Sequence, residues 1–108
     1  MIKNKNKKCI HFHADSQMQE LLDACANTGI SKQKMIHAAL KIGRSYDPSI
    51  TVDDGIIRRV WVDYDLHTAH RKESEILELS QQAYYSNIIK KFLLCEGKQL
   101  LDAFAPFV

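Results

Sequence analysis

Two short stretches in which apolar and polar side chains alternate constrain the fold of this chain most strongly. Residues 9–14 and 59–65 both place an apolar side chain at every second position. This period of two predicts half-buried strands. Because a strand this short cannot bury its apolar face alone, each one needs a partner strand. The expected apolar faces are Ile10, Phe12 and Ala14 in the first stretch and Val60, Val62 and Tyr64 in the second.

A pattern typical of two helices follows the first stretch. Asp15 or Ser16 can cap a helix over residues 17–27, because a side-chain oxygen at this position accepts from the free amides of the first turn. Gly29 suits the left-handed position just past a helix end, and Ser31 then starts a second helix. The expected buried side chains are Met18, Leu21, Leu22 and Cys25 in the first helix and Met35, Ile36, Ala39, Leu40 and Ile42 in the second.

The second stretch is also followed by two helical patterns. We expect a helix over residues 67–82, a break near residues 83–85, and a helix that carries Ile88 and Phe92 and is interrupted at Gly97. The order strand–helix–helix therefore occurs twice, which indicates a degenerate internal repeat. The expected fold is mainly α with a short antiparallel β-ribbon, and its two repeats share one core. The expected parts are a basic arm (1–8), two repeats (9–44 and 58–97), a connector (45–57) and a C-terminal segment (98–108).

Positive charge is concentrated at the start of the chain. The net charge of the 108 residues is +2, but the first eight residues contribute +4 and the others −2. A short basic arm before a folded domain suits a polyanion such as nucleic acid. The alternative is a solvated N-terminus that keeps the protein soluble. The arm carries Lys3, Lys5, Lys7 and Lys8.

Several classes of protein are not expected. No apolar run approaches the roughly 18–20 residues of a membrane span. The chain has no Gly-rich phosphate loop, nucleophile elbow or His-Glu-x-x-His motif. Cys9, Cys25 and Cys95 are widely spaced, so a disulfide framework is not expected and Cys25 and Cys95 are interpreted as core thiols. We therefore expect a cytoplasmic protein that is not an enzyme and has no cofactor, small-molecule substrate or membrane partner.

The first repeat resembles the ribbon-helix-helix family of DNA-binding proteins, the Arc/MetJ/CopG group. The resemblance covers residues 8–43, and its most specific part is Gly-Ile-Ser-Lys at residues 29–32, similar to the family's Gly-apolar-Ser-basic opening of the second helix. In that family two paired strands form an antiparallel ribbon that enters the major groove. The resemblance implies double-stranded DNA as the partner. Two copies in one chain resemble the tandem arrangement of TraY-type conjugation proteins, so a transcriptional repressor or a plasmid transfer-origin accessory protein is expected.

The outward strand residues correspond to the base-contacting positions of the family. We expect His11 to lie opposite Trp61, which directs Ile10 and Phe12 toward the core together with their partners Val62 and Val60. Cys9 then faces Asp63, and His13 faces Arg59. The residues expected to contact bases are Cys9, His11, His13, Arg59, Trp61 and Asp63.

Phosphate contacts are expected from the arm and from the start of each second helix. The resemblance implies a clamp of backbone amides near Ser31 and Lys32, and a helix N-terminus does bind anions. The matching start in the second repeat, residues 84–86, lacks the Ser at the cap position and the basic neighbour. The expected phosphate contacts are Lys3, Lys5, Lys7, Lys8, Ser31, Lys32, Tyr85 and Ser86.

The ribbon departs from the family pattern, which favours Arg, Lys, Gln, Asn and Thr. Arg59 could read guanine and Trp61 could contact thymine methyl groups. Asp63 could accept from a cytosine amine, although a carboxylate near phosphates also weakens binding. Such a face suits an asymmetric DNA site. It would equally suit a non-enzymatic protein-interaction module, antitoxin-like or an inhibitor, that keeps the fold without base readout.

The histidines allow further interpretations. Cys9, His11 and His13 lie on one strand face, where neighbouring side chains could share a zinc ion. The favoured alternative is that they are polar groove-facing residues without a metal. Because histidine titrates near neutrality, DNA affinity is expected to rise as the pH falls toward about 6. His67 and His70 are interpreted as part of a solvated helix face.

The C-terminal segment contains a short amphipathic turn. Leu100, Leu101 and Phe104 are expected to cover the core, and Phe107 follows after Pro106. The alternative is a surface for a second copy of the chain or for another protein.

Overall fold

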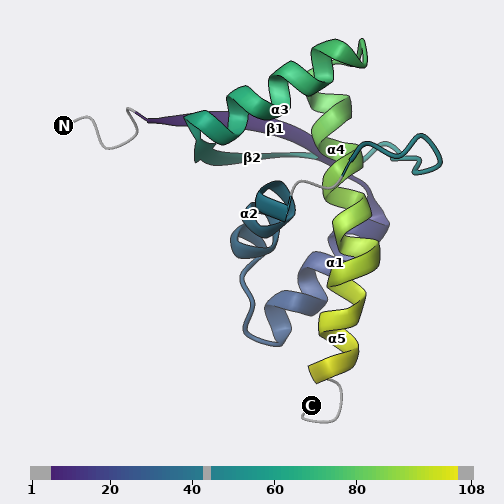
Figure 1. Ribbon diagram of the computed structural model, residues 1–108. Helices are drawn as coiled ribbons and strands as arrows, with labels where there is room; N and C mark the ends of the chain where they lie inside the picture. The colour runs from purple at the N-terminus through teal and green to yellow at the C-terminus, as the bar shows by residue number, and fades with distance from the viewer. Residues whose placement is uncertain (1–5, 43–44, 105–108) are drawn as a thin grey trace.

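The computed structural model describes residues 6–42 and 45–104 of the chain. A two-stranded antiparallel sheet packs with one face against the helices (Figure 1). The prediction of a mainly helical chain with a short antiparallel ribbon is therefore confirmed. Lys3, Lys5 and Phe107 lie outside the described residues. The elements are β1 (Lys7–Ala14), α1 (Ser16–Asn27), α2 (Lys32–Ile42), β2 (Ile56–Asp63), α3 (Tyr64–Ile76), α4 (Gln81–Phe92), a π-helical turn η1 (Leu93–Gly97) and α5 (Lys98–Phe104).

The two strands pair with the expected faces but in a different register. Cys9 lies opposite Trp61 and His11 opposite Arg59, so the expected pairing of His11 with Trp61 is wrong by two residues. A slip of two residues leaves every side chain on the same face, and the alternation in the sequence therefore could not distinguish the two registers. Tyr64 is not a strand residue, because α3 begins there directly after β2.

The inward face of the ribbon packs into one hydrophobic core. Phe12 is fully buried there, and residues of α1, α2, α4 and η1 complete the cluster. Leu100 and Leu101 pack against the same cluster, as expected for a C-terminal segment that covers the core. The inward ribbon residues of the core are Ile10, Phe12, Ala14, Val60 and Val62.

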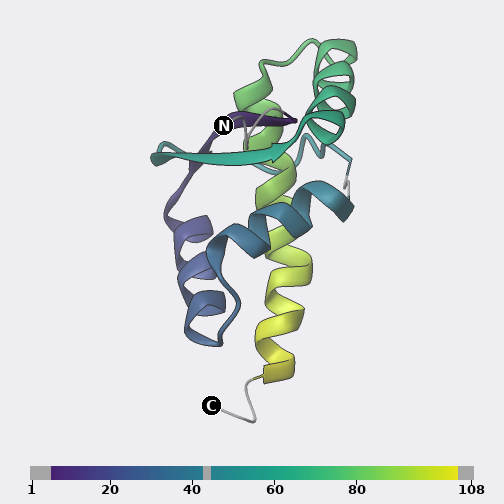
Figure 2. The same cartoon turned by 90° about the vertical axis from the view of Figure 1, so that its left-hand side faces the viewer.

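The second pair of helices has different boundaries from those expected. The side chain of Ser80 accepts a hydrogen bond from the N–H of Ala83 at 3.1 Å and caps α4. The helix therefore begins at Gln81, and the expected break near residues 83–85 is wrong. Gly97 does not interrupt the chain's helical path either, because η1 connects α4 directly to α5. Together α4, η1 and α5 form one long column (Figure 2).

The two halves of the chain share an order of elements but differ in their packing. In Figure 1, α3 lies on one side of the ribbon, α1 and α2 lie on the other, and α4 runs past the ribbon from one side to the other. The long column formed by α4, η1 and α5 has no counterpart in the first half. One half therefore supplies the central helix of the molecule, and the other packs around it.

Candidate nucleic-acid interface

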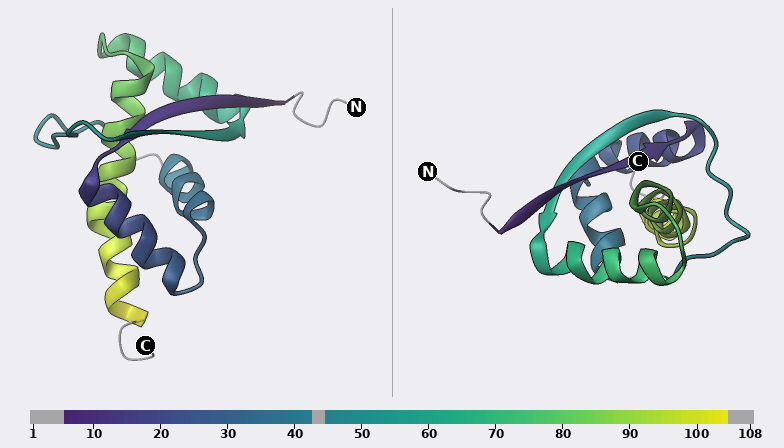
Figure 3. Two further views of the ribbon diagram at one scale, coloured as in Figure 1. Left: turned by 180° about the vertical axis from the view of Figure 1, so that it is seen from behind. Right: turned by 90° about the horizontal axis from the view of Figure 1, so that it is seen from above.

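The outward face of the ribbon is open to solvent. Seen from above, the ribbon curves round the outside of the helices (Figure 3, right). His11 and Arg59, which lie opposite each other at its centre, are both exposed. Trp61 is 47% exposed and Ile57 is 56% exposed on the same face, whereas Cys9 and His13 are half-buried. The structure thus places five of the six expected base-contacting residues on one outward surface.

Each edge of the ribbon is held by a side chain of a neighbouring helix. On the β2 edge, His37 of α2 lies 2.8 Å from the backbone oxygen of Trp61 through its Nε2. A carbonyl oxygen only accepts, so His37 carries a proton on Nε2 and donates it. On the β1 edge, the N–H of His13 donates to Ser86 Oγ of α4 at 2.8 Å. These two hydrogen bonds fix how the outward face is presented relative to the helices.

Asp63, the sixth expected base-contacting residue, lies at the end of the ribbon and is engaged within the protein. Lys7 Nζ donates to its carboxylate at 2.9 Å. This hydrogen bond and the charge of Lys7, followed by the charges of Lys41 and His37, hold the pKa of Asp63 below its ordinary value. The expected position of Asp63 opposite Cys9 is wrong, because in the observed register Lys7 is its partner.

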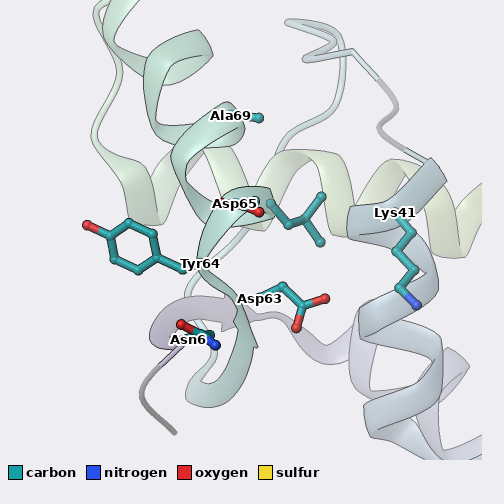
Figure 4. Close-up of a pocket in the computed structure, with 7 residues that line it drawn as sticks. Asn6, Lys41, Asp63, Tyr64, Asp65 and Ala69 are labelled. Atoms are coloured by element: carbon teal, nitrogen blue, oxygen red, sulfur yellow. The ribbon is translucent and has the colours of Figure 1, made fainter.

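Asp63 also borders a large cavity. This open cleft of about 850 Å³ lies where the ribbon meets α2 and α3. In Figure 4, Lys41 of α2 and Asp63 point toward each other, while the ring of Tyr64 points away. Because both positive and negative side chains line the cleft, its charge favours no single class of ligand. Its polar lining residues are Asn6, Lys41, Asp63, Tyr64 and Asp65.

No cluster of three or more metal-ligating side chains occurs among the described residues. Cys9 faces Trp61 rather than a carboxylate, and His11 faces Arg59. The side chains of the C-x-H-x-H stretch therefore have apolar or cationic neighbours across the ribbon. These neighbours supply no further metal ligand.

The residues expected to contact phosphates differ in whether the structure leaves them at the surface. Ser31 caps α2 by accepting from the N–H of Lys34 at 3.1 Å, so the first expected helix start is correct. Lys32 is only partly available, because its Nζ lies 2.6 Å from a carboxylate oxygen of Asp23. Lys8 is exposed on β1.

Tyr85 and Ser86 do not begin a helix. Both lie inside α4 and are buried, 1% and 3% exposed. Burial removes them from any phosphate at the surface, and Ser86 is already hydrogen-bonded to His13. The expectation that they form a second phosphate contact is withdrawn for this reason.

The sequence interpretation missed two residues that extend the outward surface. Gln81 and Gln82 of α4 line a shallow cleft of about 180 Å³ beside Cys9 and His11. Ser86 Oγ donates to the carbonyl of Gln82 at 2.7 Å and accepts from His13, which fixes this turn of α4 against β1. The sequence feature that could have located this turn of α4 was Ser80, a good N-cap residue just before a helical pattern.

Comparison of the chain with protein-family models, with curated proteins and with solved structures finds no match. Within residues 6–42 and 45–104, no helix is long and apolar enough to cross a membrane.

Proposed function

We propose that the chain binds double-stranded DNA by inserting the outward face of its β1–β2 ribbon into the major groove. The observation that carries this proposal is the open surface centred on the His11–Arg59 pair, on a ribbon whose two edges are held by helix side chains. A major groove about 12 Å wide admits a two-stranded ribbon. The resemblance of residues 8–43 to ribbon-helix-helix proteins supports this mode. The role is then that of a repressor or a transfer-origin accessory protein.

The side chains on this surface divide into base readers and phosphate contacts. Arg59 is suited to guanine, whose O6 and N7 accept two hydrogen bonds from one guanidinium group. Trp61 offers an apolar surface to thymine methyl groups. On the two flanks, the start of α2 at Ser31 and the first turn of α4 at Gln81 meet the phosphate backbones. The carboxylate of Asp63 weakens DNA binding only a little, because Lys7 neutralises its charge.

Trp61 is the only tryptophan in the chain, so its fluorescence reports directly on this surface. On addition of a duplex, we expect the emission of Trp61 to change in parallel with binding. Affinity should also fall steeply with salt, by about 10³-fold or more between roughly 50 and 200 mM if six or more phosphates are contacted.

The decisive variants are Arg59→Ala and Arg59→Lys. Loss of a bidentate contact to guanine is expected to weaken binding to the preferred sequence by about 1–3 kcal/mol. Arg59→Lys keeps the charge, so it should lose sequence preference while keeping the salt dependence. Lys98→Ala, which removes an exposed charge on α5 far along the chain from the ribbon, is the control and should bind normally. Base readout by the ribbon is wrong if Arg59→Ala with His11→Ala leaves affinity unchanged while removal of residues 1–5 abolishes it.

A second candidate function, protein binding through the same face, is favoured by the exposure of Ile57 and Trp61. Large apolar side chains that are exposed together are typical of interaction sites. The chain would then be an antitoxin-like or inhibitor module without base readout. Absence of duplex binding at low salt, with concentration-dependent self-association that Trp61→Ala and Ile57→Ala both abolish, would support this function instead.

A further inference from the structure

Helix α3 is attached to the molecule through an unusual buried face. Its buried side chains are His67, His70 and Ser74, all of them polar. The corresponding helix of the first half, α1, buries Met18, Leu22 and Cys25 instead. The Ser74 hydroxyl donates to the carbonyl of Arg71 within the same helix. The two histidines make hydrogen bonds from α3 to other helices, and Leu66 of α3 packs against the hydrophobic core.

His70 connects α3 to two other helices. Its Nε2 lies 2.9 Å from the carbonyl oxygen of Leu40 in α2 and must donate to it. Its Nδ1 lies 3.2 Å from the hydroxyl of Tyr84 in α4. The ring is 6% exposed, so these partners replace water.

His67 is 4% exposed and lies against α4. Its Nδ1 is 2.9 Å from the hydroxyl of Tyr85, and the two rings stack with centroids 6.3 Å apart. Tyr64, one turn earlier in α3, contacts the same imidazole edge-on. A neutral imidazole suits these aromatic surroundings, whereas a buried positive charge requires a counter-charge.

The charged groups around His67 supply no such counter-charge. Burial, followed by the positive charges of Lys8 on β1 and of Arg71 and His70 on α3, holds the pKa of His67 below its ordinary value. On α4 the facing groups are the hydroxyls of Tyr84 and Tyr85. The carboxylate of Glu73 on α3 is hydrogen-bonded to the Tyr84 hydroxyl. A positive charge on His67 would therefore lie among other positive charges and the rings of Tyr64 and Tyr85.

We propose that His67 and His70 form a proton-operated latch, in which protonation of His67 detaches α3 from α4 while the rest of the core stays folded. The inference goes beyond the proposed DNA-binding function and does not depend on it. The latch acts on the ribbon because α3 begins at Tyr64, directly after β2. The N–H of Tyr64 donates to the carbonyl of Asn6 at 2.7 Å and closes this end of the ribbon. Acid thus loosens both α3 and the adjoining ribbon end.

Amide hydrogen exchange tests the latch, with rates expressed as protection factors at each pH. The neutral form is bound, so attachment is complete above the ordinary histidine pKa of about 6.5 and weakens below it. Between about pH 7.5 and 5.5, the protection of α3 amides should fall by up to about tenfold, the limit for a histidine that stays neutral in the attached state, while that of α1 amides stays constant. His67→Gln keeps a hydrogen-bonding group that does not titrate, and should remove this dependence. His11→Gln, the same change at an exposed histidine, should retain it.

The wild-type protein provides a measurement that does not depend on the folding of a variant. A direct NMR titration of the His67 ring should give a pKa below about 6.5. The latch is overturned if His67 titrates at or above that value, or if α3 and α1 lose protection together. It is also overturned if α3 stays fully protected at about pH 5.5, or if His67→Gln shows the same change in protection as the wild type.

Discussion

At the scale of single residues, the Asp15–Lys90 pair joins the two halves of the chain. Lys90 Nζ of α4 lies 2.6 Å from the Asp15 carboxylate, and the two side chains are 8% and 2% exposed. Asp15 also accepts from the N–H of Met18 at the start of α1 and from the N–H of Asp53 in the connector. Lys90 donates in addition to the carbonyl of Thr51. One ion pair thus caps α1, fastens the connector and positions α4.

Removing one partner of this pair is expected to destabilise the protein strongly. Asp15→Asn or Lys90→Met should each lower the free energy of unfolding by about 3–5 kcal/mol, because the remaining charge is buried without its partner. The double variant should lose less than the sum of the two single losses. Urea denaturation measures all three values. Additive losses would contradict the direct pairing of these side chains.

The same pair predicts the direction of an acid dependence. Burial raises the pKa of Asp15, but the hydrogen bonds from Lys90, Met18 and Asp53 outweigh it, and the pKa lies below the ordinary value of 3.8. The stabilisation is therefore fully present above that value and is lost as the pH falls through the lower pKa of the folded state. This loss occurs at a lower pH than the change expected from His67.

At the scale of elements, the start of α4 decides which residues flank the ribbon. The N-cap at Ser80 makes Gln81 and Gln82 the first turn, and buries Tyr84 and Tyr85 against His70 and His67. Had the helix begun three residues later, as its apolar pattern suggested, the tyrosines would lie at a helix end. Local capping chemistry therefore controls both the candidate DNA surface and the attachment of α3.

Loss of this cap is a simple test of the boundary. Ser80→Ala should lower the free energy of unfolding by about 1 kcal/mol, because the Ala83 N–H loses its acceptor. Ser16→Ala is the matched control, since Ser16 is exposed in the first turn of α1, where Asp15 provides the cap. It should change stability by less than about 0.5 kcal/mol. Equal effects of the two changes, measured by urea denaturation, would contradict the assigned start of α4.

At the scale of the whole molecule, the ribbon is completed within one chain. β1 and β2 pair over their full lengths, and one hydrophobic cluster includes residues from both halves. Within the described residues neither half has a second strand of its own, so neither should fold independently. This follows from the need of a short strand for a partner.

A single chain with a complete ribbon is expected to be monomeric and to unfold as one unit. The molar mass from sedimentation equilibrium should be close to 12.4 kDa, and the unfolding midpoint should not change with protein concentration. A midpoint that rises with concentration would indicate strands paired between chains. A fragment of residues 1–44 should lack cooperative unfolding.

The sequence by itself determined the strand faces, the order of the elements and the position of α1 and α2. These features follow from short-range physics: the period of two in Ile10, Phe12 and Val60, the cap at Asp15 and the left-handed Gly29, whose φ is +96°. The pattern also located the outward surface that carries His11 and Arg59. Each of these features depends only on residues that are near neighbours along the chain.

Only the tertiary structure decided the register, the burial of His67 and His70 and the pairing of Asp63 with Lys7. A two-residue slip keeps the same ribbon faces, so the register depends on partners such as Ser86 and His37 from distant helices. The burial of a polar side chain likewise depends on hydrogen-bond partners far away in the sequence. For His67 and His70 those partners are the two tyrosines of α4 and the Leu40 carbonyl of α2. Patterns of apolar residues carry no information about these contacts, because the groups that satisfy a buried histidine are themselves placed by the fold.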